Sequence, residues 1–167
     1  MISAIFKVVP GYDGRKDNLA IIDTMNYISE HPITNGVYCL GCSNKIDDAV
    51  DQFMKTKEIF GKNDGVMCRH YMLSFSEHEK ITMDTVIRLA YETACFFWNN
   101  GFQVYYGIHS NNTNGGFHIH YCVNSVNIFN GKKIPINADF KHAFMAFVKK
   151  IDFLGERIYV NESNSYV

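Results

Sequence analysis

Residues 102–126 read FQVYYGIHSNNTNGGFHIHYCVNSV, two alternating runs on either side of a polar loop rich in Asn and Gly. In the first run the even-numbered positions from 102 to 108 are apolar or aromatic, and in the second run the odd-numbered positions from 117 to 123 are. A period of two is typical of a strand with one side in the core. The stretch therefore predicts two strands, 102–109 and 117–126, joined by a loop short enough for an antiparallel hairpin.

The rest of the chain alternates between β-branched runs and segments with helical periodicity. Pro, Gly and Asn separate these segments, as expected for loops. The pattern predicts an α+β fold, with one mostly antiparallel sheet and helices packed on it as a two-layer or three-layer sandwich. Residues 1–167 are expected to form a single domain. The other predicted strands are 2–9, 36–42, 66–75 and a short one after Asn130 and Gly131, and the predicted helices are about 18–30, 44–60, 82–98 and 139–154.

The composition fits a protein with one core and reduced cysteines. The 167 residues are 47% hydrophobic, which is enough for one buried core. No apolar stretch reaches the length of a membrane span, and the N-terminus lacks a signal-peptide pattern. Five cysteines are an odd number in a chain that needs no disulfides, so we expect free thiols in a cytoplasmic protein. Cys39 and Cys42 have CxxC spacing but no second pair, so a zinc site there is not favoured.

The net charge gives no sign of a nucleic-acid ligand. Sixteen Lys and Arg stand against seventeen Asp and Glu, for a formal charge of −1. A domain that binds duplex DNA is usually basic, because phosphate contacts dominate its affinity. Composition alone therefore argues mildly against DNA, although a cleft could be locally basic through Arg15, Lys16, Arg69 and Lys132.

Three histidines stand on the polar sides of the two predicted strands. The period of two places His118 and His120 on one side of their strand, and the hairpin could bring His109 beside them. Three imidazoles suit a divalent transition metal and leave positions open for a substrate oxygen, which indicates catalysis. A lone HxH motif more often belongs to a half-exposed polar side of a strand than to a metal site. The third histidine makes the metal site the favoured interpretation. Asn124 falls on the same side, where it could hold a ligand or bond the backbone of a neighbouring strand.

Tyr27 lies off the apolar stripe of the first predicted helix. Ile21, Met25 and Ile28 belong to that stripe, and Tyr27 falls nearly opposite to it. Its side chain is therefore available to solvent or to a site. Exposed tyrosines are common, so this position alone does not indicate catalysis.

Several segments resemble the relaxase/mobilisation nucleases of the HUH endonuclease superfamily, which include MobA- and Vir-type relaxases of plasmids and conjugative elements. HIHYCVNSVN (118–127), with GIHSNN before it and GKK after it, is similar to the family's histidine motif, in which two histidines flank an apolar residue. MNYISEHPITNG (25–36) resembles the segment that bears the nucleophilic tyrosine, and CSNKIDDAVDQFMKTKEIFGK (42–62) resembles the helix after it. RHYMLSFSEHEKIT (69–82) resembles the His-x-x-x-Ser-Phe strand with its acidic turn. The segments keep the family's order over about residues 19–150.

The resemblance implies a DNA relaxase that nicks one strand at an origin of transfer, for conjugation or plasmid mobilisation. Carried over position by position, it implies that Tyr27 is the nucleophile of a transesterification that leaves a 5′-phosphotyrosyl protein–DNA adduct. It also implies that His109, His118 and His120 hold a divalent metal, Mn²⁺ or Mg²⁺ before Zn²⁺, Ni²⁺ or Co²⁺. The implied partners are single-stranded DNA at the origin and accessory proteins of the relaxosome.

Two further residues are supporting candidates, and one position departs from the family. His70 is predicted on a strand side with Ser74, where a role at the site and a structural role are equally reasonable. Glu79 could orient a metal histidine, or it could form a capping box with Ser76. Family members commonly carry an aspartate two residues after the first metal histidine, and here that position is Asn111. This difference puts a carboxylate role there in doubt.

Three other functions stay open. A rolling-circle replication initiator of the same superfamily shares the tyrosine and the metal site, but a tyrosine upstream of the histidines favours a relaxase. A three-histidine enzyme acting on small molecules would be indifferent to DNA. A relaxase-like accessory DNA-binding protein with weakened catalysis would fit Asn111 and the neutral charge. Relaxases usually continue beyond this domain, so we expect either part of a longer protein or a minimal one.

Aromatic residues of the hairpin are candidates for stacking on DNA bases. Tyr105 falls on the histidine side of its strand, whereas the alternation places Tyr106, Phe117 and Tyr121 in the core. Tyr105 is therefore the aromatic residue of the hairpin that we expect to be available.

Overall fold

A computed structural model of the chain describes residues 1–9, 13–30, 32–33, 36–110, 116–135, 137–153 and 155–162. At its centre is a seven-stranded sheet with the strand order β2-β4-β5-β3-β1-β7-β6. Neighbouring strands pair antiparallel except β1 and β7, which are parallel. Among the residues described, no helix is both long and apolar enough to cross a membrane. The elements are β1 (Ile2–Val8), α1 (Ala20–Ser29), β2 (Tyr38–Leu40), α2 (Ile46–Ile59), β3 (Cys68–Phe75), α3 (Met83–Asn99), β4 (Val104–Ser110), β5 (Phe117–Asn124), α4 (Ala138–Val148), β6 (Asp152–Phe153) and β7 (Glu156–Glu162).

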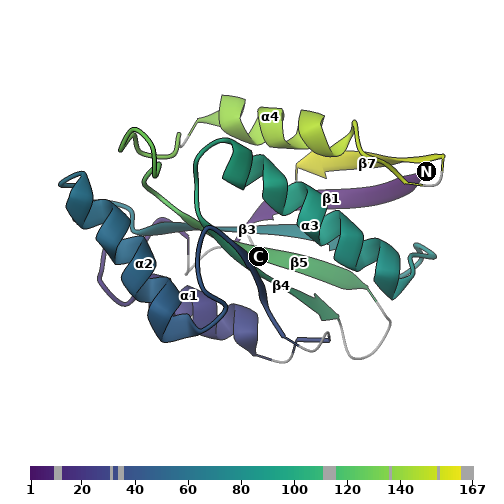
Figure 1. Cartoon of the computed structure of the whole chain (residues 1–167). Coiled ribbons are helices and arrows are strands. Elements are labelled where there is room, and N and C mark those ends of the chain that lie inside the picture. Colours follow the sequence, from purple (N-terminus) through teal and green to yellow (C-terminus); the bar gives the residue numbers. More distant parts are fainter. Residues whose placement is uncertain are drawn as a thin grey trace.

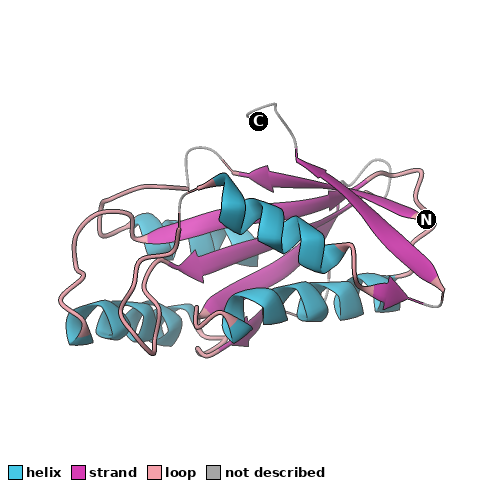
Figure 2. Cartoon of the chain, turned by 90° about the horizontal axis from the view of Figure 1, so that it is seen from above, coloured by secondary structure: helices cyan, strands magenta, loops and turns pink. Residues whose placement is uncertain are grey.

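Helices cover both faces of this sheet (Figure 1). Helices α3 and α4 pack on one face, in a core that includes Phe97, Phe144 and Tyr121. Helices α1 and α2 pack on the opposite face, in a second core that includes Met25 and Phe53. Seen from above, one helix crosses in front of the strands and further helices lie along one side of them (Figure 2). The predicted α+β class with a mostly antiparallel sheet is confirmed, and the layers number three.

The hairpin strand β4 is buried on both sides, which corrects the prediction of a single core side. Every residue from Phe102 to Ile108 is buried. Val104 and Tyr106 belong to the core under α3 and α4, whereas Tyr105 belongs to the core under α1 and α2. Alternation of polarity indicates which way each side chain points, but it does not show whether a second layer of helices covers the more polar side.

The C-terminal segment also differs from the prediction. The helix expected over 139–154 ends at Val148, and the chain then forms β6 and β7. In β7 the side chains of Ile158 and Val160 are 2% and 1% exposed and alternate with exposed neighbours. This is the period of a strand with one buried side, so the sequence carried the signal.

The short strand expected after Asn130 and Gly131 is reduced to one bridge between Val126 and Lys133. Side-chain hydrogen bonds shape this segment instead. Asn127 Oδ1 accepts from the backbone N–H of residues 129 and 130 (2.9 and 3.2 Å). These bonds hold the turn that precedes the expected strand, where the sequence predicted a turn at Asn130 and Gly131.

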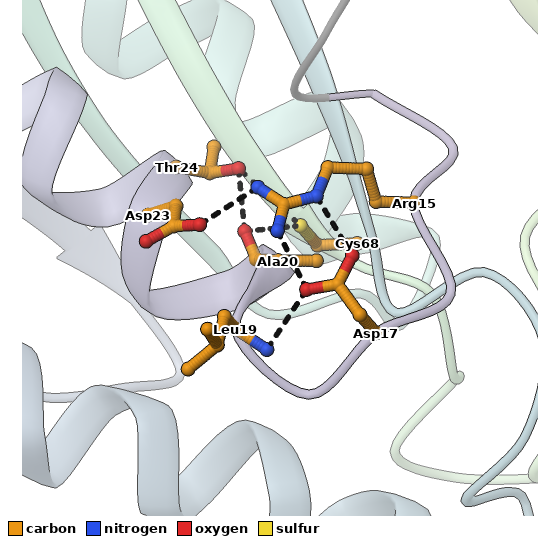
Figure 3. Close-up of polar contacts among 7 residues, drawn as sticks. All are labelled: Arg15, Asp17, Leu19, Ala20, Asp23, Thr24 and Cys68. Atoms are coloured by element: carbon orange, nitrogen blue, oxygen red, sulfur yellow. Dashed lines mark hydrogen bonds and ion pairs between the residues drawn. The ribbon is translucent and has the colours of Figure 1, made fainter.

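An arginine fixes the start of α1 (Figure 3). Arg15 bonds the carboxylate of Asp17 through Nη2 (2.6 Å) and that of Asp23 through Nη1 (2.7 Å). Asp17 Oδ1 also accepts the backbone N–H of Leu19 (3.1 Å), just before the first helical residue. The Asp17 carboxylate thus pairs one backbone N–H at the start of the helix, whose N-cap residue is Leu19.

Candidate active site

Four histidines lie on the α1 side of the sheet, on three adjacent strands. His70 comes from β3, His109 from β4, and His118 and His120 from β5. The register places His109 opposite His118, so their side chains point to the same face. Ring centroids are 4.6 Å apart for His109 and His120, 5.3 Å for His70 and His120, and 6.4 Å for His118 and His120. The hairpin thus brings His109 beside the HxH pair.

Tyr27 packs against three of these imidazoles. Its ring centroid lies 5.4 Å from that of His120, 5.5 Å from that of His70 and 5.8 Å from that of His109. The side chain is half-buried near the C-terminal end of α1, and the neighbouring Ile28 is fully buried. Helix α1 therefore brings this tyrosine against histidines that are far from it in the sequence.

Two hydrogen bonds orient the rings. His70 Nε2 and His120 Nδ1 are 3.1 Å apart, so one imidazole donates to the other. His109 Nε2 lies 2.8 Å from the carbonyl oxygen of Ile28. Because a carbonyl oxygen only accepts, His109 Nε2 carries the proton, and the lone pair of the neutral ring is on Nδ1. The end of α1 thus fixes the tautomer of a histidine on β4.

Burial keeps His70 and His120 uncharged at neutral pH. It lowers the pKa of His120 to about 2 and that of His70 to about 3, and repulsion between the histidines adds to both shifts. Burial also lowers the pKa of His118, and the positive charge of Lys7 acts in the same direction. Neutral imidazole is the form that binds metal ions.

The donor set fits a divalent transition metal in its chemistry. Both ring nitrogens of His118 are buried without a hydrogen-bond partner among the described residues, whereas buried polar atoms normally have one. His109 Nδ1 and His120 Nε2 are further nitrogens on the same face, and imidazole nitrogens suit such ions. In the described part of the chain no three His, Cys, Asp or Glu side chains already converge for an ion. Binding would therefore require the rings to turn toward a common point.

Asn124 does not reach the histidines, which corrects its assignment as a supporting candidate. It lies four residues beyond His120 on β5, a distance of about 13 Å along a strand. Its Oδ1 accepts from Lys57 Nζ (2.7 Å), and its Nδ2 donates to Gln103 Oε1 (2.7 Å). The amide is thus occupied in a buried network under α2.

Glu79 is bound to β1 and not to an imidazole. Its carboxylate accepts the backbone N–H of Ser3 (3.0 Å). The capping box with Ser76 does not form either, because helix α3 is capped by Thr82, whose Oγ1 accepts from Thr85 N (3.2 Å). Of the supporting candidates, His70 is the one that the structure brings to the cluster.

Arginines expected to line a basic cleft are paired with carboxylates. Arg15 is held by two aspartates at the start of α1. Arg69 Nη2 lies 2.9 Å from Asp13 Oδ2, and both side chains are more than nine-tenths buried. Tyr105, expected to be available to bases, is 1% exposed. Asn111, the departure from the family pattern, lies outside the described residues.

Lys57 is a buried cation that the sequence analysis missed. Its ammonium donates to Asn124 Oδ1 (2.7 Å) and Ser125 Oγ (2.8 Å), and burial lowers its pKa to about 7. A signal for this burial exists, because Ala49, Phe53 and Lys57 recur every four residues and fall on one face of α2. Lysines are rarely buried, which is why periodicity alone does not suggest it.

Comparisons with known proteins identify the family and the fold. Residues 27–152 match the family model described as relaxase, MobA/VirD2-like, nuclease domain. The fold is similar to a solved structure from work on the molecular basis of vancomycin resistance transfer in Staphylococcus aureus, with a TM-score of 0.58, 14% identity, and coverage of 96% of this chain and 98% of that one. The sequence matches no curated protein. Since the family match spans well over half of the chain and includes Tyr27 and all four clustered histidines, the chain belongs to the MobA/VirD2-like relaxases and carries their nuclease domain.

Proposed function

We propose that this protein nicks one strand of DNA at an origin of transfer, with Tyr27 as the nucleophile and a divalent metal at His109, His118 and His120. The observation that supports it most is the packing of the Tyr27 ring against three imidazoles, at centroid distances between 5.4 and 5.8 Å. A phenol and a group of imidazole nitrogen donors thus share one site. A phosphodiester could meet both at once.

The reaction is a transesterification. The Tyr27 oxygen forms a bond to the scissile phosphorus, and the bond from phosphorus to the 3′ oxygen of the upstream nucleotide breaks. The phenol loses its proton, and the departing 3′ oxygen takes one up. The products are a 3′ hydroxyl and a 5′-phosphotyrosyl link. Because the link is a phosphodiester like the one that broke, the 3′ hydroxyl can reverse the step, which suits strand transfer and rejoining.

The nucleophile needs positive charge nearby that the histidines do not provide. An ordinary tyrosine has a pKa near 10, and burial holds His70 and His120 neutral. A bound divalent ion would supply this charge as a Lewis acid on the phosphate. Mn²⁺ and Mg²⁺ are the first ions to test, followed by Zn²⁺, Ni²⁺ and Co²⁺.

His70 acts as a positioning residue in this proposal. With Nδ1 of His120 donating to His70 Nε2 (3.1 Å), His120 Nε2 keeps its lone pair for the metal. The Ile28 carbonyl has the same effect on His109, where it leaves Nδ1 as the ligand atom. Each of these two ligands would then have its tautomer set by a neighbour.

The experiment is adduct formation on labelled single-stranded DNA that carries the origin of the protein's own mobile element, with Mn²⁺, Mg²⁺ or chelator, resolved on a denaturing gel. A covalent band is expected with metal and not with chelator, and Tyr27→Phe should abolish it. Tyr91→Phe is the matched control, because Tyr91 is 52% exposed on α3, which packs on the other face of the sheet. An adduct that persists in Tyr27→Phe would make another tyrosine the nucleophile.

The adduct assay, together with a non-denaturing binding assay on the same DNA, separates the other candidate functions. DNA binding with no adduct under any metal would point to an accessory DNA-binding protein. No binding and no adduct would point to an enzyme with small-molecule substrates. Nicking at an origin of replication rather than transfer would indicate an initiator.

A further inference from the structure

The sheet face that carries the histidines is covered over only part of its width. Under α1 and α2, Tyr105 is 1% exposed and Cys122 is fully buried. On β1 and β7 the side chains of the same face are exposed, with Ile5 at 43% and Tyr159 at 49%. Figure 1 shows β1 and β7 at the side of the sheet away from α1 and α2.

Strand register shows that this open part continues the histidine cluster. His118 lies opposite Ser74, Ser74 opposite Ile5, and Ile5 opposite Asn161. Residues paired in this way point to one face. From β4 to β7 the row crosses four strand spacings, about 19 Å. The surface next to the candidate active site, here called the open face, consists of Ser3, Ile5, Lys7, Met72, Ser74, Arg157, Tyr159 and Asn161.

The open face carries apolar and cationic side chains among uncharged polar ones. Ile5 and Tyr159 offer exposed apolar or aromatic area. Lys7 lies one strand beyond Met72, which is itself opposite His120. Neither Lys7 nor Arg157 makes an ion pair with a described residue.

A third cation reaches the aromatic ring at the edge of this surface. Lys149, the residue that ends α4, places Nζ 5.6 Å from the centroid of the Tyr159 ring. Such a contact holds the ring and the ammonium together. Tyr159 is therefore an exposed ring with positive charge beside it, whereas Arg15 and Arg69 are bound by aspartates.

We propose that the open face binds the single-stranded DNA on one side of the nick, with a base stacked on Tyr159 and phosphates on Lys7 and Arg157. Exposed aromatic side chains on a sheet, flanked by cations, are the usual means of binding single strands. The distance of about 19 Å from His109 on β4 across the open face to β7 accommodates a few nucleotides. That the bound strand leads to the nick at Tyr27 rests on the proposed function. The binding itself can be measured without cleavage.

The test is fluorescence anisotropy with labelled single-stranded DNA in chelator, so that no cleavage occurs. Tyr159→Ala should weaken binding roughly 5- to 150-fold, the range for loss of one stacked base, and Tyr159→Phe should bind like the wild type. Tyr91→Ala is the matched control, since Tyr91 is 52% exposed on α3. Lys7→Ala should lower the slope of log affinity against log salt by about 0.7, the value for one phosphate contact. Lys55→Ala, at an exposed lysine of α2, should leave the slope unchanged.

Two measurements keep this inference separate from the proposed function. Tyr27→Phe should abolish the adduct yet bind DNA as the wild type does, and Tyr159→Ala should still form the adduct at saturating DNA. If Tyr159→Ala and Lys7→Ala both bind like Tyr91→Ala, the open face is not the DNA surface, whatever the adduct assay gives. A dimer by analytical ultracentrifugation that dissociates in Tyr159→Ala, with unchanged DNA affinity, would assign the face to a second copy of the chain and overturn the proposal. Circular dichroism confirms that each variant is folded.

Discussion

His70 Nε2 lies 3.1 Å from His120 Nδ1, across the ladder that joins β3 and β5. Both rings also contact Tyr27, with centroid distances of 5.5 and 5.4 Å. A histidine outside the HxH motif is therefore hydrogen-bonded to one of the proposed ligands. This contact can be tested through metal affinity and not only through activity.

Replacement of His70 should weaken metal binding without removing a ligand. Loss of a residue that orients a ligand typically costs 10- to 100-fold in metal affinity, and we expect His70→Ala to fall in that range for Mn²⁺ by isothermal titration calorimetry. His70→Gln keeps a hydrogen-bonding group and should recover part of the loss. His78→Ala is the control, because the His78 side chain is 88% exposed. An Mn²⁺ affinity of His70→Ala equal to that of the control would make His70 purely structural.

His118 should be needed for metal binding and dispensable for the metal-free fold. Its ring nitrogens make no hydrogen bond with a described residue, so His118→Ala should change the melting temperature in chelator only slightly. For the wild type, Mn²⁺ at one hundred times its Kd should stabilise the fold by about 2.7 kcal/mol, a rise of roughly 5 to 10 °C for a chain of this size. His118→Ala should lose most of that rise. A full rise in the variant would remove His118 from the ligand set.

The sequence predicted on which side of a strand each residue points, but not which helix covers that part of the sheet. Period-two alternation correctly placed His118, His120 and Asn124 on one side of β5. It could not show that the amide of Asn124 lies under α2 and is bonded to Lys57. The face to which a strand side chain points is a local property of the backbone. Its burial and its partners depend on which helix covers that part of the sheet.

Long-range pairing was also beyond the sequence. Glu79, in the turn after β3, was a candidate to orient a metal histidine. In the structure β1 lies beside β3, and the backbone N–H of Ser3 donates to the Glu79 carboxylate. Similarly, β7 inserts next to β1 as a parallel partner, and a pattern within one segment does not specify its neighbour. Helical geometry showed only that Tyr27 lies off the apolar stripe of α1, and its assignment as the nucleophile came from the resemblance of residues 25–36 to the family's tyrosine segment.

The buried amine of Lys57 should make stability depend on pH. Burial lowers its pKa to about 7, against 10.5 for a lysine in the unfolded chain. Between these values the unfolded state binds the proton and the folded state does not, so the free energy of unfolding rises with pH, by at most about 1.4 kcal/mol per unit. Between pH 7 and 9 we expect a rise of about 1 to 2 kcal/mol in urea unfolding that is absent in Lys57→Met. Lys55→Met, at an exposed position of the same helix, should keep the wild-type slope, and equal slopes in both variants would contradict the assignment.

Gly107 sets how closely the end of α1 approaches the sheet, and so where Tyr27 lies. A methyl group at this position would lie 2.9 Å from Ile28 Cγ2 and 3.0 Å from the Ile28 carbonyl oxygen, the acceptor for His109. Gly107→Ala must therefore push α1 away from β4, which should cost about 1 to 3 kcal/mol in urea unfolding and slow adduct formation in single-turnover assays at saturating DNA. Part of this clash is with the Ile28 side chain, which Ile28→Ala would remove. In the double variant Gly107→Ala/Ile28→Ala, the loss in free energy of unfolding should therefore be smaller than the sum of the two single losses, by at least about 0.5 kcal/mol. Wild-type stability and adduct rate in Gly107→Ala would show that the position of α1 does not depend on this contact.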